Sequence, residues 1–143
     1  MGFEPLAWRE AEIPTYPDLA GKVALVTGGS GGIGAATCRL LAANGAPALA
    51  AVVAGIRDQG GRTIGIAGGV TDHSAIEELR GRAEDEFGPT DLLFAFAGGG
   101  IPPPGPTAGI FEDVRLAALF LASNASSWIS GITLGASGGR TMS

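Results

Sequence analysis

The sequence predicts an α/β fold built on a parallel sheet, and three observations carry that prediction. Short apolar runs alternate with longer helical stretches along the chain. A glycine-rich turn follows the first apolar run directly, in KVALVTGGSGGIG at residues 22–34. A second run, DLLFAFA at residues 91–97, is continuously apolar after Asp91. Such a run is typical of a central parallel strand with both faces covered.

Strand and helix are expected to alternate through the first half of the chain. The predicted elements are a buried strand at 22–27, a tight turn at 28–32, a helix at 33–44, a helical stretch at 46–61 and a short strand at 62–70. The first helix is expected to end at Asn44, because an Asn-Gly pair punctuates the chain there. No room is expected for a strand directly after Gly45, since a strand averages about 5 to 6 residues and a parallel pair needs a crossover.

The second half begins with a helix whose start carries several capping residues. Thr71, Asp72 and Ser74 are all N-cap types, and Ser74 with Glu77 has the spacing of a capping box. The apolar stripe of this helix contains Ile76, Leu79, Ala83 and Phe87. After the apolar strand, the glycines and prolines that follow exclude regular structure. An amphipathic helix at 112–123 and a strand at 129–139 complete the predicted elements.

Composition limits the class of protein. The formal net charge is −5 and 45% of the residues are hydrophobic, with no basic patch, so we expect neither a nucleic-acid partner nor an anionic membrane surface. No apolar stretch reaches the roughly 20 residues of a membrane span, and no signal peptide is expected. A single cysteine, Cys38, fits the reducing cytoplasm. We expect an irregular N-terminal arm at residues 1–17 and one domain at residues 18–143.

The glycine turn satisfies more than one motif. Gly29, Gly31 and Gly34 fit the G-x-G-x-x-G dinucleotide fingerprint, whereas Gly28, Gly32 and Gly34 fit T-G-x-x-x-G-x-G. The end of the strand at residue 27 favours the second register. In that register Gly28 makes the turn, Gly32 lets the backbone approach a pyrophosphate, and Gly34 lets the helix pack closely on the strand. The helix N-terminus then offers N–H groups to phosphates.

The glycine turn is also compatible with other kinds of site. An isolated glycine fingerprint is often a turn that binds nothing. A P-loop is excluded, because no Gly-Lys-Ser/Thr follows. A methyltransferase-type loop is a weaker alternative, given the Thr-Gly start. The strand, turn and helix together favour a dinucleotide site, and no metal site is expected.

At this point the chain resembles the short-chain dehydrogenase/reductase family. GKVALVTGGSGGIGAATCRLLAANGA resembles its first strand, cofactor turn and first helix. GGVTDHSAIEELRGRAEDEFGPTDLLFAFAGGG resembles its third and fourth strands with the helix between them. EDVRLAALFLASNASSWISGITLGASGG resembles its C-terminal helix, turn and last strand. The resemblance implies a Rossmann-type, doubly wound parallel sheet, which is incomplete in this sequence.

The resemblance also implies an activity, hydride transfer between NAD or NADP and a small-molecule alcohol or carbonyl substrate. It implies a homodimer or homotetramer. The residues it assigns to the cofactor are Gly28, Ser30, Gly32, Ile33 and Gly34 at the pyrophosphate, Val70 at the adenine, and Ala97 and Gly98 at the nicotinamide ribose. Two positions depart from the family pattern. Gly69 stands where many members carry aspartate, and Phe96 stands where a bracing asparagine is usual.

The family's catalytic segment is missing from the sequence. Its chemistry needs a Tyr, a Lys four residues later and a Ser. The chain has one Tyr and one Lys, Tyr16 and Lys22, in the wrong spacing and place, so no catalytic residue is assigned. We interpret the sequence as part of a longer enzyme, with residues of that enzyme missing near Pro47 and near Ala108. The alternative is a nucleotide-binding or structural remnant without hydride transfer.

Overall fold

The computed structural model describes residues 14–46, 48–49, 63–65, 71–98 and 108–136. Its elements, in chain order, are the 3-10 turn η2 (Pro17–Leu19), β1 (Ala24–Thr27), α1 (Gly32–Ala43), β2 (Ala48–Leu49), β3 (Thr63–Ile64), α3 (His73–Phe87), β4 (Leu92–Ala95), α4 (Ala108–Ala122) and the 3-10 turn η3 (Asn124–Ser126). The described strands form one parallel sheet with the order β3-β2-β1-β4. The predicted α/β class is confirmed.

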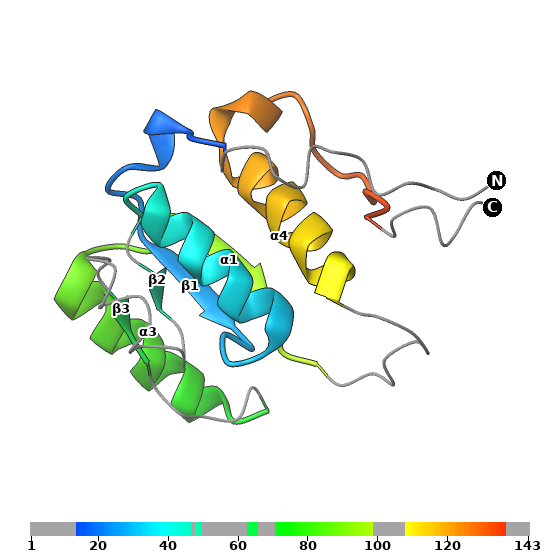
Figure 1. Ribbon diagram of the computed structural model, residues 1–143. Helices are drawn as coiled ribbons and strands as arrows, with labels where there is room; N and C mark the ends of the chain where they lie inside the picture. The colour runs from blue at the N-terminus through cyan, green and yellow to red at the C-terminus, as the bar shows by residue number, and fades with distance from the viewer. Residues whose placement is uncertain (1–13, 47, 50–62, 66–70, 99–107, 137–143) are drawn as a thin grey trace, which may run out of the picture.

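Strand β1 lies in the middle of this sheet, and its residues contact the helices on both faces. Ala24 and Val26 are buried in a cluster with residues of α1 and α4, whereas Leu25 packs with Ala83 of α3. Successive side chains of a strand point to opposite faces. Helices α1 and α4 therefore cover one face, and α3 covers the other (Figure 1).

The larger core cluster lies between the sheet, α1 and α4. Its buried members are Leu19, Ala24, Val26, Cys38, Leu40, Leu41, Ala46, Phe94 and Leu119. Bulky side chains of α1, α4 and the 3-10 turn meet in this cluster, so α1 and α4 pack against each other through apolar side chains. Burial of such side chains contributes roughly 1.5 to 3 kcal/mol each.

The structure contradicts the expectation that no strand follows Gly45. Strand β2 begins at Ala48 and pairs in parallel with β1. Helix α1 itself is the crossover between the two strands. It ends in a C-capping motif in which Gly45 has φ +77°. The Gly45 N–H donates to the Ala42 carbonyl and the Ala46 N–H donates to the Leu41 carbonyl, so the chain turns directly after the helix. The predicted helix at 46–61 is therefore wrong at residues 48–49, and residues 50–62 lie outside the described residues.

Helix α3 begins one residue after Asp72, which is its N-cap. The Asp72 carboxylate accepts hydrogen bonds from the backbone N–H groups of Ser74 at 2.9 Å and Ala75 at 3.3 Å. The capping box between Ser74 and Glu77 is therefore wrong, because Ser74 already lies within the helix. Glu77 instead forms an ion pair with Arg80 at 2.8 Å. Three residues of the predicted apolar stripe, Leu79, Ala83 and Phe87, pack with Leu25 and Ile64. The fourth, Ile76, is half-buried and lies outside this cluster.

Two predicted strands differ from the structure at the β4 side of the sheet. Strand β4 is an edge strand among the described residues, and Leu93 is 67% exposed, so the prediction of cover on both faces is wrong. Residues 129–136 form no strand, and residues 137–143 lie outside the described residues. The reasons differ. Leu93 lies on the same face as its partner Leu25, and α3 packs around Leu25 and Ile64 without Leu93. Residues 129–136 pair with no described strand, and a strand needs such a neighbour.

The start of the described chain is fixed to the end of α1 by one buried side chain. The Asn44 Oδ1 atom accepts a hydrogen bond of 2.7 Å from the Tyr16 backbone N–H, and its Nδ2 atom donates to the carbonyls of Leu40 and Pro14. Residues 1–13 of the predicted arm lie outside the described residues. None of the described helices has both the length and the apolar character that a membrane crossing requires.

Candidate functional site

The glycine turn joins β1 to α1 in a single tight bend. Gly28 follows the last residue of β1 and adopts φ +67°, a left-handed conformation that favours glycine. The Gly31 N–H donates to the Gly28 carbonyl at 2.9 Å, which closes the turn. Gly31 is the extended N-cap of α1, and its carbonyl accepts the Ala35 N–H at 2.8 Å. The helix therefore starts at the point where the turn ends.

Two of these glycines are required by close approach of the backbone. A Cβ atom on Gly28 would lie 2.8 Å from the Ala97 nitrogen and 2.8 Å from the Phe96 carbonyl carbon. A Cβ atom on Gly34 would lie 2.8 Å from the Gly28 carbonyl carbon. The glycine at Gly34 thus lets α1 pack on the turn itself, rather than on the strand as the motif suggested. Larger side chains at either position would separate these segments.

The end of β4 lies directly beside the turn. The Ala97 backbone N–H donates a hydrogen bond of 3.2 Å to the Thr27 Oγ1 atom, at the end of β1. This bond places half-buried Ala97 and exposed Gly98 next to Gly28. Nothing lies within 4 Å of the position that a Cβ atom on Gly98 would take. Sequence reasoning did not identify Thr27 as a site residue, and the only signal for it was a hydroxyl at a strand end.

The turn lies at the point where the strand order reverses. From β1 the sheet continues to β2 on one side and to β4 on the other, and all of these strands run in parallel. Ligands of open α/β sheets bind at the carboxyl ends of strands at such a switch point. The glycine turn, Ala97 and Gly98 therefore share the position where this architecture places a ligand.

The electrostatics of the site come from the backbone. No charged residue occurs between Lys22 and Arg39, and the first turn of α1 contains no acidic side chain. The first N–H groups of a helix lack intrahelical acceptors and carry the positive end of its dipole. Ser30, Gly31 and Gly32 are exposed there, and Ile33 is half-buried. This end of α1 is suited to an anion, which is what a pyrophosphate supplies.

Comparison with known proteins now identifies the family. The family model described as short chain dehydrogenase matches residues 22–121. The chain belongs to the short chain dehydrogenase family. It is 44% identical over 87 residues to the cis-4-hydroxycyclohexanecarboxylate dehydrogenase of Sinomonas cyclohexanicum, a match that covers 55% of this chain and 35% of that protein. It is 36% identical over 89 residues to the 2,3-dihydro-2,3-dihydroxybenzoate dehydrogenase of Bacillus subtilis, covering 56% of this chain and 34% of that protein.

A solved structure gives the same result for the fold. The hydroxysteroid dehydrogenase of Escherichia coli superposes with a TM-score of 0.56 and 28% sequence identity, over 75% of this chain and 51% of that chain. The Rossmann-type parallel sheet expected for a short chain dehydrogenase is therefore confirmed, and it is incomplete. The match to each of the two curated relatives spans about a third of the relative's length.

The structure separates Tyr16 and Lys22 from the glycine turn. Tyr16 packs against the core near the end of α1, and Lys22 precedes β1, at the strand end opposite Gly28. The Lys22 ammonium lies 4.0 Å from the Asp18 carboxylate. These are the only Tyr and Lys of the chain, and neither reaches the carboxyl edge of the sheet. Val70 and Gly69 lie outside the described residues.

Phe96 replaces the family's bracing asparagine with an apolar contact. Its ring centroid lies 5.8 Å from that of Phe94, at an interplanar angle of 40°. It packs against the core cluster under α1 and α4, and it cannot donate the hydrogen bonds of an amide. The bond between Ala97 and Thr27 joins the carboxyl ends of β4 and β1, and a bond from the Val23 N–H to the Asp91 carboxylate joins their amino ends.

The described residues contain no group of three or more His, Cys, Asp or Glu side chains placed to hold a metal ion. His73 lies exposed in the first turn of α3, on the face of the sheet opposite α1. The chemistry of the candidate site is therefore that of backbone N–H groups and small side chains.

Proposed function

We propose that this protein is an NAD(P)-dependent oxidoreductase and that the chain supplies its dinucleotide-binding part. The observation that carries the proposal is the contact between Gly28 and the end of β4, beside the N-terminus of α1. The proposed substrate is a small alcohol or carbonyl compound. When bound, the nicotinamide would accept or donate the hydride; the residues of this chain hold and orient the dinucleotide.

The residues at the site fit a dinucleotide in three respects. The glycines at Gly28 and Gly34 draw the turn, the helix and β4 together, while exposed Gly32 leaves the backbone open to a ligand. The α1 N-terminus offers N–H donors to a pyrophosphate, and the Ser30 hydroxyl adds a further donor. Ala97 and Gly98 continue the same edge toward the position proposed for the nicotinamide ribose. Ile33 and Val70 complete the proposed set of cofactor residues.

A second candidate function is nucleotide binding without hydride transfer. It is favoured by the position of Tyr16 and Lys22 at the far end of β1, away from the candidate site. General acid–base catalysis needs a proton donor within hydrogen-bond reach of the reacting atom. Both candidate functions predict binding of the dinucleotide, and only the first predicts turnover.

The test is a titration of the full chain with NADH and with NADPH, followed through the cofactor's own fluorescence and by calorimetry. We expect saturable binding at one site per chain. Ser30→Asp and Ser30→Asn form a matched pair, because they differ in charge and hardly in size. A carboxylate about 4 Å from a phosphate costs about 1 kcal/mol in water, so Ser30→Asp should bind about fivefold more weakly than Ser30→Asn.

The outcomes separate the two functions. Absence of binding up to millimolar cofactor would overturn both, and equal affinities for the two Ser30 variants would place the cofactor elsewhere. With binding established, the gene is sequenced across the positions near Pro47 and Ala108. The oxidoreductase predicts a Tyr-x-x-x-Lys segment there, and reduction of NAD or NADP with a panel of secondary alcohols, measured at 340 nm, by the protein that contains it. A gene that encodes these residues alone, with cofactor binding and no reduction, supports the second function.

We also propose that the protein works in the cytoplasm as a homo-oligomer. The compartment is supported by its single cysteine, Cys38, which is buried as a free thiol. The oligomer is supported by β4, which lies at the edge of the described sheet with Leu93 67% exposed.

A further inference from the structure

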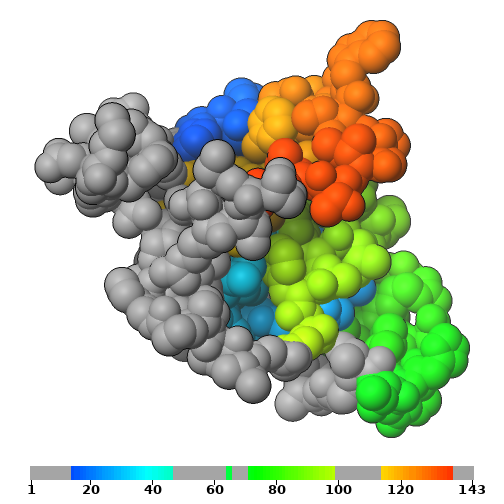
Figure 2. All heavy atoms as spheres, turned by 90° about the vertical axis from the view of Figure 1, so that its right-hand side faces the viewer, coloured from blue at the N-terminus to red at the C-terminus, as the bar shows by residue number. Residues whose placement is uncertain are grey.

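The chain that leaves β4 packs on the glycine turn one residue beyond the last strand pair. The described ladder between β1 and β4 ends at Thr27 and Ala95. A Cβ atom on Gly28 would lie 2.8 Å from the carbonyl carbon and oxygen of Phe96 and 2.8 Å from the Ala97 nitrogen. The peptide group between Phe96 and Ala97 therefore lies directly on Gly28. Figure 2 shows β4 and the residues after it, in lime, at the surface beside the cyan residues of α1.

Phe96 carries the one bulky side chain at this point of the sequence. Residues 95–100 read AFAGGG, so the neighbours of Phe96 carry methyl groups or no side chain. Such residues offer little surface for packing, and glycine leaves the backbone free to adopt many conformations. Ala97 is half-buried, and a Cβ atom on Gly98 would meet nothing within 4 Å. The position of this segment therefore depends on the Phe96 side chain and on the bond from the Ala97 N–H to Thr27 Oγ1.

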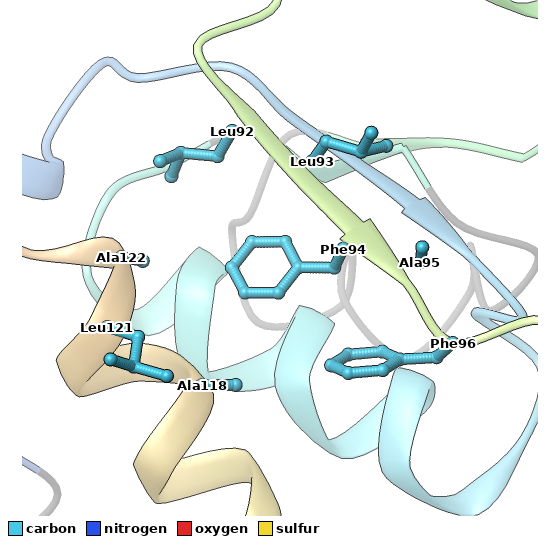
Figure 3. Close-up of a pocket in the computed structure, with 8 residues that line it drawn as sticks. All are labelled: Leu92, Leu93, Phe94, Ala95, Phe96, Ala118, Leu121 and Ala122. Atoms are coloured by element: carbon cyan, nitrogen blue, oxygen red, sulfur yellow. The ribbon is translucent and has the colours of Figure 1, made fainter. Parts of the chain in front are cut away.

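The Phe96 ring is held by apolar contacts on the α4 side of the sheet. Its centroid lies 5.8 Å from that of Phe94, with an angle of 40° between the planes, which is a favourable separation for an aromatic pair. The ring also packs against the larger core cluster between the sheet, α1 and α4. Together with Phe94, Ala118 and Leu121 it lines an apolar groove. Figure 3 shows both rings pointing from β4 toward the helices.

We propose that Phe96 is a positioning residue: its ring fixes the peptide group between residues 96 and 97 against Gly28, and thereby fixes Ala97 and Gly98 at the proposed cofactor site. The side chain acts through the backbone and touches no cofactor atom. The ring holds this peptide group from the core, while Gly28 and Thr27 hold it from the turn. The effect on cofactor affinity rests on the proposed function, whereas the effect on the peptide group does not.

Three variants separate this role from a purely structural one. Phe96→Leu and Phe96→Asn are similar in size, but leucine keeps apolar packing whereas asparagine places an amide against apolar side chains. Phe87→Leu is the matched control, because Phe87 is also a half-buried phenylalanine and lies in the smaller core cluster, on the other face of the sheet. A residue that only filled the core would lower stability, as Phe87→Leu does, without moving the peptide group beside Gly28.

The first test is hydrogen exchange at the Ala97 amide of the full chain without cofactor, followed by NMR. Loss of the aromatic pair in Phe96→Leu should speed this exchange roughly two- to tenfold, while Phe87→Leu should leave it close to the parent rate. In a Thr27→Val background the acceptor is already lost, so Phe96→Leu should add little. Equal exchange in the parent and Phe96→Leu, or equal acceleration by Phe87→Leu, would overturn the inference, and Phe96→Leu decides the test even if Phe96→Asn does not fold.

The second test is a titration of the same variants with NADH, at a temperature where all of them are folded. We expect the Kd of Phe96→Leu to rise roughly two- to tenfold, that of Phe96→Asn to rise further, and that of Phe87→Leu to match the parent. If the parent binds NADH and Phe96→Leu binds it equally well, the role in cofactor positioning is overturned. If the parent binds no NADH, the proposed function fails, and the Ala97 exchange rates still decide whether Phe96 fixes the peptide group.

Discussion

The Ala97 backbone N–H and the Thr27 Oγ1 atom form a 3.2 Å hydrogen bond that joins the ends of β4 and β1 beside the glycine turn. We predict that Thr27→Val removes this acceptor and lowers the free energy of unfolding by about 1 kcal/mol. It should also weaken NADH binding several-fold, because Ala97 and Gly98 lose their fixed position. Thr27→Ser keeps the hydroxyl and serves as the control. Urea unfolding and cofactor titration measure both effects. Equal behaviour of the Val and Ser variants would show that the bond does not position the strand end.

Gly34 and Gly81 form a matched pair of glycines within helices. A Cβ atom at Gly34 would meet the Gly28 carbonyl carbon at 2.8 Å, whereas at Gly81 nothing lies within 4 Å. Gly34→Ala should therefore destabilise the fold by about 1 to 3 kcal/mol, as overpacking does. Gly81→Ala should stabilise it by roughly 0.5 to 1 kcal/mol through helix propensity. Thermal unfolding compares the two. If both substitutions stabilised the protein, α1 would not pack closely on the turn.

The Asp72 cap predicts a dependence of stability on pH. Hydrogen bonds from the Ser74 side chain and from the backbone N–H groups of Ala75 and Ser74 lower the pKa of the Asp72 carboxyl. Its contribution is therefore present above the usual aspartate pKa of about 3.9 and is lost as the pH falls through the lower value in the folded protein. Asp72→Ala should lower the melting temperature at pH 7, and the difference from the parent should shrink below pH 4.

Asp72→Asn is the control for this cap, since asparagine caps a helix without titrating. Its melting temperature should stay closer to that of the parent at pH 7. A difference between parent and Asp72→Ala that remains constant from pH 7 to pH 3 would contradict the charged cap.

Cys38 should resist thiol reagents while the protein is folded. Burial raises the pKa of its thiol to about 12, against a smaller opposing effect of Arg39. The thiolate is the reactive form, so burial both suppresses it at pH 8 and keeps reagents from the sulfur. Labelling with a chromogenic disulfide should be slow in buffer and complete in urea. Fast stoichiometric labelling in buffer would show that α1 does not pack on the sheet as described.

Local signals in the sequence predicted several features correctly. The Asn44-Gly45 pair placed the end of α1, because the left-handed Gly45 is a local requirement. The apolar runs placed β1 and β4. The cap of α3 was ambiguous, since three residues of suitable type lie within four positions. The helix start that the fold adopts selects Asp72 among them.

Features that depend on tertiary pairing could not be predicted from the sequence. Strand β2 contains only Ala48 and Leu49, too few residues for a period to be detected. The exposure of Leu93 on β4 depends on how far α3 extends over that face of the sheet, which the apolar residues of the strand do not reveal. The bond between Ala97 and Thr27 joins residues 70 positions apart. The cofactor residues that the motif indicated are brought together in part by such long-range contacts, and their role in binding stays a prediction.

We propose that the glycine turn, the start of α1 and the end of β4 together hold a dinucleotide. The most direct measurement is a titration of the ¹⁵N-labelled chain with NADH, followed by backbone amide NMR. We predict that the largest shifts occur at the amides of Ser30, Gly31, Gly32, Ile33, Gly34, Ala97 and Gly98, with little change along α3. Saturating shifts confined to α3, or none at millimolar NADH, would contradict the account.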